Sequence, residues 1–491
     1  MRGLMQKMKR TRTRFAPSPT GYMHIGNLRT ALFEYLIAKH DNGDFLLRIE
    51  DTDQTRQVEG AEDMIYRTLK DCGLNWDEGP DIGGEYGPYI QSQRLPMYKG
   101  YAQQLIDLGG AHYCFCSEEE VEAKRKEAEE LGIGFKYEDP CRHLSKEEVQ
   151  AKLEAGEPYV IRQTIRNVGE TFFDDEVYGH IDFDGDLLDE QILLKSDGFP
   201  TYNFANIIDD HTMGISHVVR GNEYLSSTPK YNLIYDAYGW ERPTYVHVPP
   251  VMKDEHHKLS KRNGDASFQD LVKKGYLPEA IINYLALLGW SPDDDQEIFT
   301  MEELIRRFDV KRISKAPAIF DIDKLTWMNG VYLRSMDLET FHETIRDWLE
   351  PALTNKDLDT MAIARILQPR TDTLAQIPEN VDFFNELPDY DLQMYRHKKM
   401  KTTPELSLTS LQAARAALAG IEDWTEDNVH EVLLALPKEM GLKNGQVLWP
   451  VRTAITGKQF TPGGAIEIAA ILGKEETLRR IDLGIERLGA L

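Results

Sequence analysis

The stretch that decides the fold is Arg14-Phe-Ala-Pro-Ser-Pro-Thr-Gly-Tyr-Met-His24-Ile-Gly-Asn27. Residues 13–16 read as a short strand that enters this Pro- and Gly-rich turn, and apolar residues at helical spacing predict a helix from 27 to 40. Residues 45–49 read as a second strand, which ends in an acidic cluster. The order strand, turn, helix and strand predicts a βαβ unit whose two strands are parallel.

The turn has the chemistry of an anion-binding site. A helix that begins directly after a parallel strand has free backbone amides and the positive end of its dipole at its N-terminus. Gly26 lets a flat ring or a phosphate approach the backbone closely, and His24 can donate a hydrogen bond to a phosphoryl oxygen as charge develops there. Taken alone, the same residues also fit a plain strand-to-helix connection with an incidental histidine.

Composition limits the class of protein. The chain has 491 residues, of which 41% are hydrophobic and 28% charged, so it can bury the cores of several domains. The longest apolar run, at 281–290, falls well short of the about 20 residues that a membrane span needs. Residues 1–13 are basic and too short for a transit peptide, so they read as an exposed leader. We therefore expect a cytoplasmic protein with no membrane segment.

Residues 95–200 read as an α+β insertion that splits the α/β domain. They contain a charged helix at 117–131, whose start fits a capping box of Ser117 with Glu120. A strand is expected at 159–164.

Downstream of the insertion the pattern returns to strands and then becomes helical. Strands are expected at 200–208 and 216–219. From about 270 onward apolar residues recur at helical spacing, as at 277–288 and 301–308. The predicted fold is a Rossmann-like α/β domain with an α+β insertion, followed by an all-α C-terminal half.

A second polar segment carries three cations in five residues. It reads HHKLSKRNG (256–264) and includes Lys258, Lys261 and Arg262. A mobile cationic loop suits a polyphosphate leaving group, because negative charge builds up on the departing oxygens. On its own, the segment fits a solvated basic loop better.

Together the two segments resemble the paired signatures of the class I aminoacyl-tRNA synthetases, known as HIGH and KMSKS. Here they read HIGN (24–27) and KLSKR (258–262), in the same order and in the same α/β context. The fourth position of the first signature is Asn27 and not histidine, so His24 is the one histidine of that signature. Further stretches resemble bacterial-type glutamyl-tRNA synthetases over essentially the whole chain: RFAPSPTG (14–21), LRIEDTD (47–53), LNWDEGP (74–80), YGPY (86–89), DGFPTYNFA (197–205), MGISH (213–217), YLPEA (276–280) and LALLGWS (285–291).

The resemblance implies a domain organisation. Residues 1–94 and 201–253 would form the Rossmann-like catalytic domain of a class I synthetase. Residues 95–200 would be an inserted domain that binds the tRNA acceptor end. Residues 254–338 would contact the tRNA stem and carry the cationic loop, and residues 339–491 would form the helical anticodon-binding half.

The resemblance also implies a two-step reaction. ATP activates the α-carboxylate of L-glutamate to glutamyl-AMP with loss of pyrophosphate, and the 3′ end of tRNA(Glu) then takes the glutamyl group and releases AMP. Catalysis rests on positioning and charge stabilisation, and Mg²⁺ is expected with ATP. The residues that the resemblance assigns are His24, Lys258 and Lys261 as catalytic groups, and Pro17, His24, Gly26, Asn27, Lys261 and Arg262 around ATP.

Glutamate has two carboxylates and one ammonium group, so its pocket needs an arginine for the side chain and an acid for the α-amine. Arg14 lies on the first strand, Arg220 at the end of a later strand and Glu50 at the end of the second, where α/β sheets bind ligands. The family's other pocket positions are matched by Ser18, Tyr202 and Asn206. Glutamine, which is neutral, is the chief competing substrate; the resemblance favours glutamate, because the related glutaminyl enzymes usually carry β-barrels where this chain is helical.

The chain has four cysteines, too few for a disulfide framework, and three of them lie close to a histidine. Cys114-Phe-Cys116 and Cys141-Arg-His143 form C-x-C and C-x-H pairs. In an extended segment residues i and i+2 face the same way, so each pair can present two ligands to one ion. Four such ligands suit one structural Zn²⁺. Tyr137 could replace one ligand, and the alternative to a metal site is a group of reduced thiols.

The net charge of −25 argues against a protein coated in nucleic acid, but a local basic face can still bind RNA. Two groups of basic residues qualify: Arg306, Arg307, Lys311, Arg312 and Lys315, and then Arg396, His397, Lys398, Lys399 and Lys401. Each group fits a solvated surface equally well. The sequence leaves open whether tRNA(Gln) is also charged, and the family expectation is a monomer.

Two other classes of function compete. An enzyme of the same superfamily that adenylates a small acid without tRNA would not need the long helical half. A non-catalytic RNA-binding paralogue would not need His24, Lys258 and Lys261. Both fit the sequence less well than a glutamate–tRNA ligase.

Overall fold

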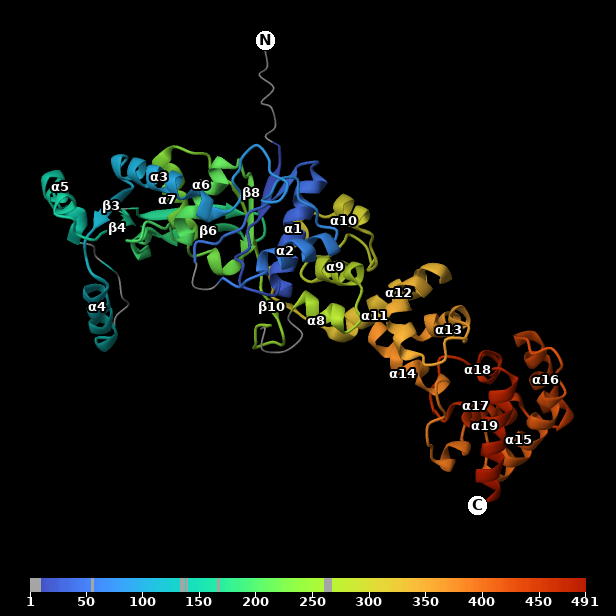
Figure 1. Cartoon of the computed structure of the whole chain (residues 1–491). Helices are drawn as coiled ribbons and strands as arrows, with labels where there is room; N and C mark the ends of the chain where they lie inside the picture. The colour runs from blue at the N-terminus through green and yellow to red at the C-terminus, as the bar shows by residue number, and fades with distance from the viewer. Residues whose placement is uncertain (1–9, 54–56, 133–136, 138–139, 166–167, 260–266) are drawn as a thin grey trace, which may run out of the picture. The chain divides into compact units, whose positions relative to one another are not determined.

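The computed structural model describes residues 10–53, 57–132, 137, 140–165, 168–259 and 267–491 (Figure 1). The chain divides into two compact units, and each is described by itself. The first unit comprises Met1–Asp270 and Ile281–Asp321, and the second Leu271–Ala280 and Ile322–Leu491. Among the described residues, no helix combines the length and the apolarity that crossing a membrane requires.

The first unit begins with the predicted βαβ arrangement. Strand β1 (Arg12–Phe15) leads through the turn into helix α1 (Ile25–His40), and strand β2 (Asp44–Leu47) returns parallel to β1. All residues of both strands are buried, as is usual for parallel strands that are covered on both faces. The parallel pair is therefore confirmed, and the helix begins two residues earlier than expected because His24 caps it.

A four-stranded sheet, in the order β6-β5-β9-β8, forms another part of the first unit. Strand β8 (His217–Gly221) runs parallel to β9 (Thr244–Val248), and Arg220 lies opposite His247 in this pair. The hairpin of β5 (Glu170–Asp175) and β6 (Gly179–Asp184) joins the edge of β9, where Asp175 lies opposite Tyr245. A part of the expected insertion thus extends the sheet that carries the site.

One predicted strand is wrong. Residues 200–208, which we expected to be a strand, begin helix α6 (Tyr202–Thr212). All residues from 204 to 210 are buried, so this part of the helix is enclosed on every side and burial does not follow a single face. Short runs of aromatic and β-branched residues fit both periods, and here packing against the neighbouring helices selects the helix.

The remaining elements of residues 95–200 form a second, smaller sheet with helices beside it. Strands β3 (Ala111–Cys114), β4 (Val160–Gln163) and β7 (Ile192–Leu194) pair in that order. Helices α3 (Leu95–Asp107), α4 (Glu118–Glu130) and α5 (Lys146–Glu154) accompany them. The predicted capping box at α4 is confirmed, because Ser117 and Glu120 each bond the other's backbone amide.

Further elements complete the first unit or link the two units. These are α2 (Ala61–Asp71), α7 (Thr228–Tyr238), β10 (Val251–Met252), α8 (Phe268–Lys273), α9 (Pro278–Leu287), α10 (Met301–Arg307) and β11 (Ala318–Ile319). Strands β10 and β11 form a short parallel pair.

The second unit is built from helices around one apolar core. They are α11 (Ile322–Ser335), α12 (Leu338–Ala352), α13 (Thr360–Leu367), α14 (Ile377–Val381), α15 (Pro404–Ala419), α16 (Glu426–Glu439), α17 (Asn444–Thr456), α18 (Ala465–Leu472) and α19 (Lys474–Gly489). Buried Arg480 donates hydrogen bonds of 2.7 Å to the carbonyls of Phe383 and Ile455. The predicted fold class, α/β followed by all-α, is confirmed.

Candidate active site and cysteine cluster

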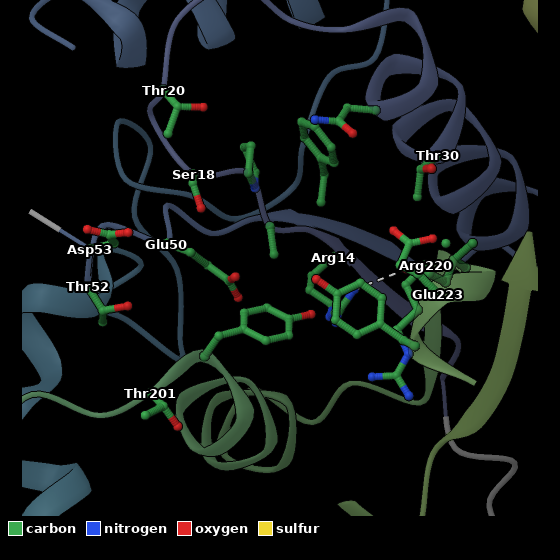
Figure 2. A pocket seen from close by; sticks show the side chains of 18 of the residues that line it. Arg14, Ser18, Thr20, Thr30, Glu50, Thr52, Asp53, Thr201, Arg220 and Glu223 are labelled. Carbon is green, nitrogen blue, oxygen red and sulfur yellow. Dashed lines mark hydrogen bonds between the residues drawn. The ribbon is translucent and has the colours of Figure 1, made fainter. Parts of the chain in front are cut away.

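A cavity of about 670 Å³ opens at the carboxyl ends of β1, β2 and β8 in the first unit (Figure 2). This is the edge at which open α/β sheets bind ligands. Seven of the predicted site residues line it: Arg14, Pro17, Ser18, Asn27, Glu50, Tyr202 and Arg220. His24, Gly26 and Asn206 do not line it. Lys261 and Arg262 lie outside the described residues.

Arg14 is held by buried acids. Its Nε and Nη2 donate to the two carboxylate oxygens of Asp210, at 2.8 and 3.2 Å. Its Nη1 donates to Glu34 at 3.3 Å and to the Val219 carbonyl at 3.4 Å. The side chain keeps an edge on the cavity, but most of its donors already serve the protein.

A second buried arginine links this network to Glu50. Arg48, whose side chain is 0% exposed, donates to Asp210 at 2.7 Å and to Glu50 at 3.0 Å. Burial alone would raise the pKa of Asp210, but the guanidinium groups of Arg14 and Arg48 hold that pKa below its ordinary value. Burial raises the pKa of Glu50, against the opposing effect of the same two arginines. An ammonium group of a ligand beside Glu50 would favour the charged carboxylate form of Glu50.

Arg220 lies on the cavity wall with part of its guanidinium unused. Its Nε donates to His247 Nε2 at 3.0 Å, and its Nη2 donates to Thr228 Oγ1 at 2.7 Å. Among the described residues, its Nη1 has no hydrogen-bond partner. Three tyrosine rings surround the guanidinium carbon at 4.9 to 5.4 Å and favour a cation there: Tyr224, Tyr231 and Tyr245.

His24 joins the turn to the start of the cationic segment. Its Nδ1 accepts a hydrogen bond from the backbone amide of Gly26 at 3.0 Å. Nε2 therefore carries the ring proton and donates to the Leu259 carbonyl at 3.1 Å. A Cβ at Gly26 would lie 3.2 Å from His24 Nδ1, which favours glycine at this position. Leu259 follows Lys258 directly, so the structure brings the two sequence signatures together.

Some cavity residues were not predicted from the sequence. Glu34 and Thr30 come from α1, and Glu223 and Tyr224 follow β8. Glu34 could have been found, because a carboxylate is out of place among the apolar residues of that helix. Asn206, which was predicted, is buried on α6, and its Nδ2 donates to the Tyr202 carbonyl at 2.7 Å.

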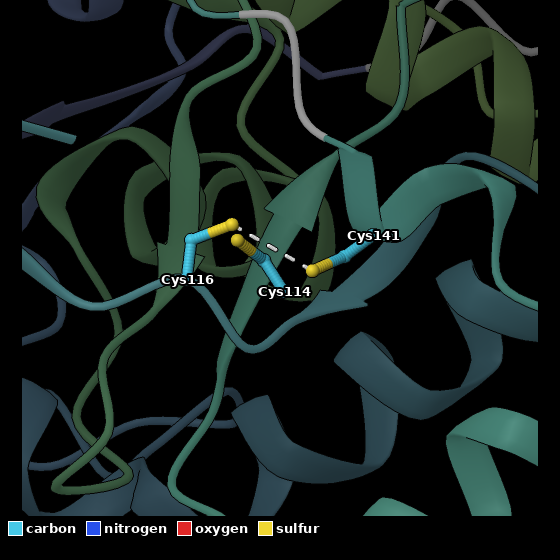
Figure 3. Close-up of side chains that lie close together, drawn as sticks. All are labelled: Cys114, Cys116 and Cys141. Carbon is cyan, nitrogen blue, oxygen red and sulfur yellow. Dashed lines mark hydrogen bonds between the residues drawn. The ribbon is translucent and has the colours of Figure 1, made fainter. Parts of the chain in front are cut away.

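Three of the four predicted metal ligands come together. The Sγ atoms of Cys114, Cys116 and Cys141 lie within 4.8 Å of one another (Figure 3), and those of Cys116 and Cys141 are 3.7 Å apart. Thiolates in a tetrahedron around zinc, each about 2.3 Å from the ion, lie at a similar spacing. The donor set and its geometry therefore fit a structural zinc ion.

The fourth position differs from what was expected. Cys141 and His143 lie in a 3-10 helix, Pro140–His143, and the expected extended segment is wrong here. In a 3-10 helix residues i and i+2 point about 120° apart, and His143 Nε2 accepts a hydrogen bond from Arg142 at 3.1 Å. The buried hydroxyl of Tyr137 lies 3.7 Å from Cys114 Sγ.

In the first basic group, at residues 306–315, several side chains are already bound to acids and carbonyls of the protein. Arg307 pairs with Asp293 and Asp294, the latter at 2.9 Å. Lys315 Nζ donates to the Tyr178 carbonyl at 3.2 Å, and Arg312 Nε donates to the Ser291 carbonyl at 2.7 Å. These contacts reduce the number of cations that the group can offer to a phosphate.

The second basic group is more available. The ring of its His397 packs against that of Trp449, with ring centroids 4.0 Å apart and the ring planes tilted by 48°. Within the described part of the chain, the exposed side chains of Arg396, Lys398 and Lys399 have no hydrogen bond or ion pair. This group is the better of the two candidates for contact with RNA.

A Rossmann-like unit whose strand-to-helix turn contacts Leu259, together with a helical second unit, is the arrangement expected of a class I aminoacyl-tRNA synthetase. Residues 10–327 match the catalytic domain described as tRNA synthetases class I (E and Q), and residues 340–485 match an anticodon binding domain. The chain belongs to this class I (E and Q) synthetase family, which confirms the resemblance seen in the sequence.

Individual relatives agree with this assignment. A glutamate–tRNA ligase of Clostridium tetani is 61% identical over 477 residues, which cover 97% of this chain and 98% of that protein. A glutamate–tRNA ligase of Clostridium acetobutylicum is 58% identical over 477 residues, with the same two shares. The crystal structure of a glutamate tRNA ligase from Elizabethkingia meningosepticum, in complex with its amino acid, is 36% identical with a TM-score of 0.89 and covers 98% of this chain and 100% of that chain.

Proposed function

We propose that the chain activates L-glutamate with ATP to glutamyl-AMP, releasing pyrophosphate, and transfers the glutamyl group to the 3′ end of tRNA(Glu), releasing AMP. The observation that carries this proposal is that Arg220 and Glu50 both line one cavity at the carboxyl ends of the strands. A free guanidinium edge suits a side-chain carboxylate, and a carboxylate suits an α-ammonium group. Glutamate offers both groups.

The roles in the amino-acid pocket follow from charge. Arg220 would bind the γ-carboxylate through Nη1, and Arg14, on β1, would add positive potential from another part of the cavity wall. Glu50 would bind the α-ammonium group. Ser18, Tyr202 and Asn206 would complete the pocket, with Asn206 acting from α6 behind Tyr202.

The activation step needs stabilisation of the phosphates. Pro17, Gly26 and Asn27 would shape the nucleotide side of the turn, and His24 would donate to a phosphoryl oxygen from Nε2, the ring nitrogen that carries the proton. Lys258, Lys261 and Arg262 would neutralise the departing pyrophosphate, because charge on its oxygens is greatest in the transition state. Class I synthetases use ATP with Mg²⁺, which is the form that we propose here.

A zinc ion would hold the second sheet to the segment after it. Cys114, Cys116 and Cys141 would be three ligands, and His143 or Tyr137 the fourth. When bound, zinc would cross-link β3 to residues 140–143 and take no part in the reaction.

The tRNA would contact three parts of the chain. Residues 95–200 would bind its acceptor end, residues 254–338 its stem and residues 339–491 its anticodon.

The partners and the setting follow from the reaction. We propose tRNA(Glu) as the RNA substrate, a monomer as the working form and the cytoplasm as the place of action, where tRNA is charged for translation. tRNA(Gln) is a second candidate substrate.

Pyrophosphate exchange tests the proposal. Labelled pyrophosphate should enter ATP when glutamate is present, and the comparison with and without tRNA(Glu) shows whether activation needs tRNA. Exchange without any tRNA requirement and no charging of tRNA would favour a small-acid adenylating enzyme. Binding of tRNA without any exchange would favour a non-catalytic RNA-binding protein.

A further inference from the structure

We propose that Asp175 and His247 are positioning residues that orient the Arg220 guanidinium for the side-chain carboxylate of the amino acid. The proposal rests on the proposed function, because it takes glutamate as the ligand of Arg220. The three side chains form a chain of hydrogen bonds that starts at Asp175, the last residue of β5, and ends at the cavity.

The first link fixes the histidine. His247 is 0% exposed, and its Nδ1 lies 2.6 Å from Asp175 Oδ2, which also accepts the His247 backbone amide at 3.0 Å. The other oxygen of Asp175 accepts the backbone amides of Val177 and Tyr178, at 2.9 and 2.8 Å. Both carboxylate oxygens are therefore anchored by backbone amides, and the imidazole ring cannot rotate without losing its own bond from Nδ1 to Asp175.

The second link fixes the arginine. The Nε of Arg220 always carries a proton and can only donate, so His247 Nε2 must accept and His247 Nδ1 must carry the ring proton. That tautomer is the one that Asp175 selects. Burial lowers the pKa of His247 against the opposing effect of Asp175, which agrees with a neutral ring that can accept from Arg220.

The consequence concerns geometry at the cavity. With Nε bound to His247 and Nη2 bound to Thr228, the edge that carries Nη1 is the one left for a ligand. The register of the sheet supports this arrangement, because Arg220 and His247 lie opposite each other on β8 and β9. A guanidinium that is already oriented loses less freedom when it binds a carboxylate.

Two substitutions at one position separate the two links. His247→Asn can still donate to Asp175 but has no acceptor at the position of Nε2. His247→Gln can place its carbonyl oxygen near that position and accept from Arg220. We expect His247→Asn to raise the KM for glutamate about tenfold or more in pyrophosphate exchange with saturating tRNA(Glu), since a hydrogen bond to a charged group is lost. We expect His247→Gln to raise it clearly less, and the KM for ATP to stay within about twofold in both variants.

A matched control and a double variant complete the test. His217→Asn changes a histidine on the same strand as Arg220, at its other end, and should leave the KM for glutamate unchanged. In an Arg220→Gln background, His247→Asn should add less than about twofold. Asp175→Asn, which would turn an amide donor toward Nδ1, should act in the same direction as His247→Asn and serves if the histidine variants do not fold.

The outcomes are distinct. A KM for glutamate in folded His247→Asn or Asp175→Asn that matches the His217→Asn control would overturn the positioning role. Equal losses in His247→Asn and His247→Gln, or an undiminished loss in the Arg220→Gln background, would also overturn it. If Arg220→Gln itself leaves the KM for glutamate unchanged, the proposed glutamate pocket fails instead.

Discussion

At the scale of single residues, the two cavity arginines differ in how much of their hydrogen-bonding capacity the protein already uses. Arg14 donates hydrogen bonds to Asp210, to Glu34 and to a carbonyl, and the carboxylate of Asp210, which Arg48 shares, compensates part of its charge. Arg220 donates to two neutral groups, a histidine and a threonine, so its charge is uncompensated by them. We therefore expect Arg220 to carry most of the preference for an anionic side chain.

Arg220→Gln tests this difference. We expect kcat/KM for glutamate to fall by a factor that corresponds to roughly 3–5 kcal/mol, as when one partner of a buried ion pair is removed. The KM for ATP should change little. Glutamine is neutral at the same position and should lose less, so the variant's preference should shift toward glutamine. The measurement is kcat/KM for both amino acids with saturating tRNA.

Arg242→Gln is a suitable control, because Arg242 forms an exposed ion pair with Asp236 away from the cavity. It should behave like the unchanged enzyme. An equal fall for glutamate and glutamine in Arg220→Gln would place Arg220 outside the side-chain pocket and leave Arg14 as the main specificity residue.

On the N-terminal turn, Pro17, Ser18 and Asn27 could be predicted to lie at the cavity because α/β sheets bind ligands where a strand turns into a helix, whereas His24 and Gly26 do not line it. Arg14, Ser18 and Glu50 line the cavity as expected. Asp175 and His247 could not be predicted, because their roles depend on the register between β5, β9 and β8. Sequence spacing does not specify which strands from distant parts of a chain become neighbours.

At the scale of elements, local signals predicted the helices better than the strands. The capping box at Ser117 and the parallel pair of β1 and β2 were visible in the sequence. The segment 200–208 was not, because alternation over a few residues fits either period and packing decides between them. The 3-10 helix Pro140–His143 likewise depends on its surroundings, so the direction in which the His143 side chain points could not be predicted from a C-x-H spacing.

The cysteine cluster gives a prediction for one element. Cys141→Ser should lower the zinc content from one ion per chain to near zero and increase proteolytic cleavage within residues 95–150. The reason is that a hydroxyl is a poor zinc ligand compared with a thiolate. Elemental analysis of protein purified without chelators measures the metal directly.

Cys72→Ser is the control, because Cys72 is a buried cysteine at the end of α2 and lies outside the cluster. Comparing His143→Ala with Tyr137→Phe then identifies the fourth ligand. Absence of zinc from the unchanged protein would refute the metal site and leave a group of reduced thiols.

An ion-pair network on α19 makes the stability of the helical unit depend on pH. Hydrogen bonds from Arg479, together with those from buried Arg480, lower the pKa of Glu476 to about 2. Because the folded pKa lies below the unfolded value of about 4.3, Glu476 adds stability above that pH and loses it as the pH falls toward 2.

We therefore expect Glu476→Gln to reduce the free energy of unfolding by about 1 kcal/mol at pH 7, after allowance for solvent screening. The difference from the unchanged protein should shrink as the pH is lowered to 3. Urea unfolding at several pH values measures it. Glu475→Gln, on the exposed side of the same turn, is the control. A difference that stays constant with pH would show that the carboxylate charge does not contribute.

At the scale of the whole molecule, the charge distribution limits how RNA can bind. The chain has a net charge of −25, so nonspecific attraction to phosphate is weak and contact must come from local basic groups. The group at residues 396–401 has unpaired side chains within the described residues, whereas the group at 306–315 is partly engaged with nearby acids and carbonyls. An acidic protein with a few basic contacts gains selectivity for an RNA whose shape reaches them.

The central claim is that this chain joins glutamate to tRNA(Glu), and direct charging of purified tRNA tests it most directly. Labelled glutamate and labelled glutamine should each be offered, with ATP and Mg²⁺, to tRNA(Glu) and to tRNA(Gln). We predict ATP-dependent attachment of glutamate to tRNA(Glu) and no attachment of glutamine to either tRNA. Failure to charge tRNA(Glu) with glutamate, or attachment of glutamine in its place, would contradict the account.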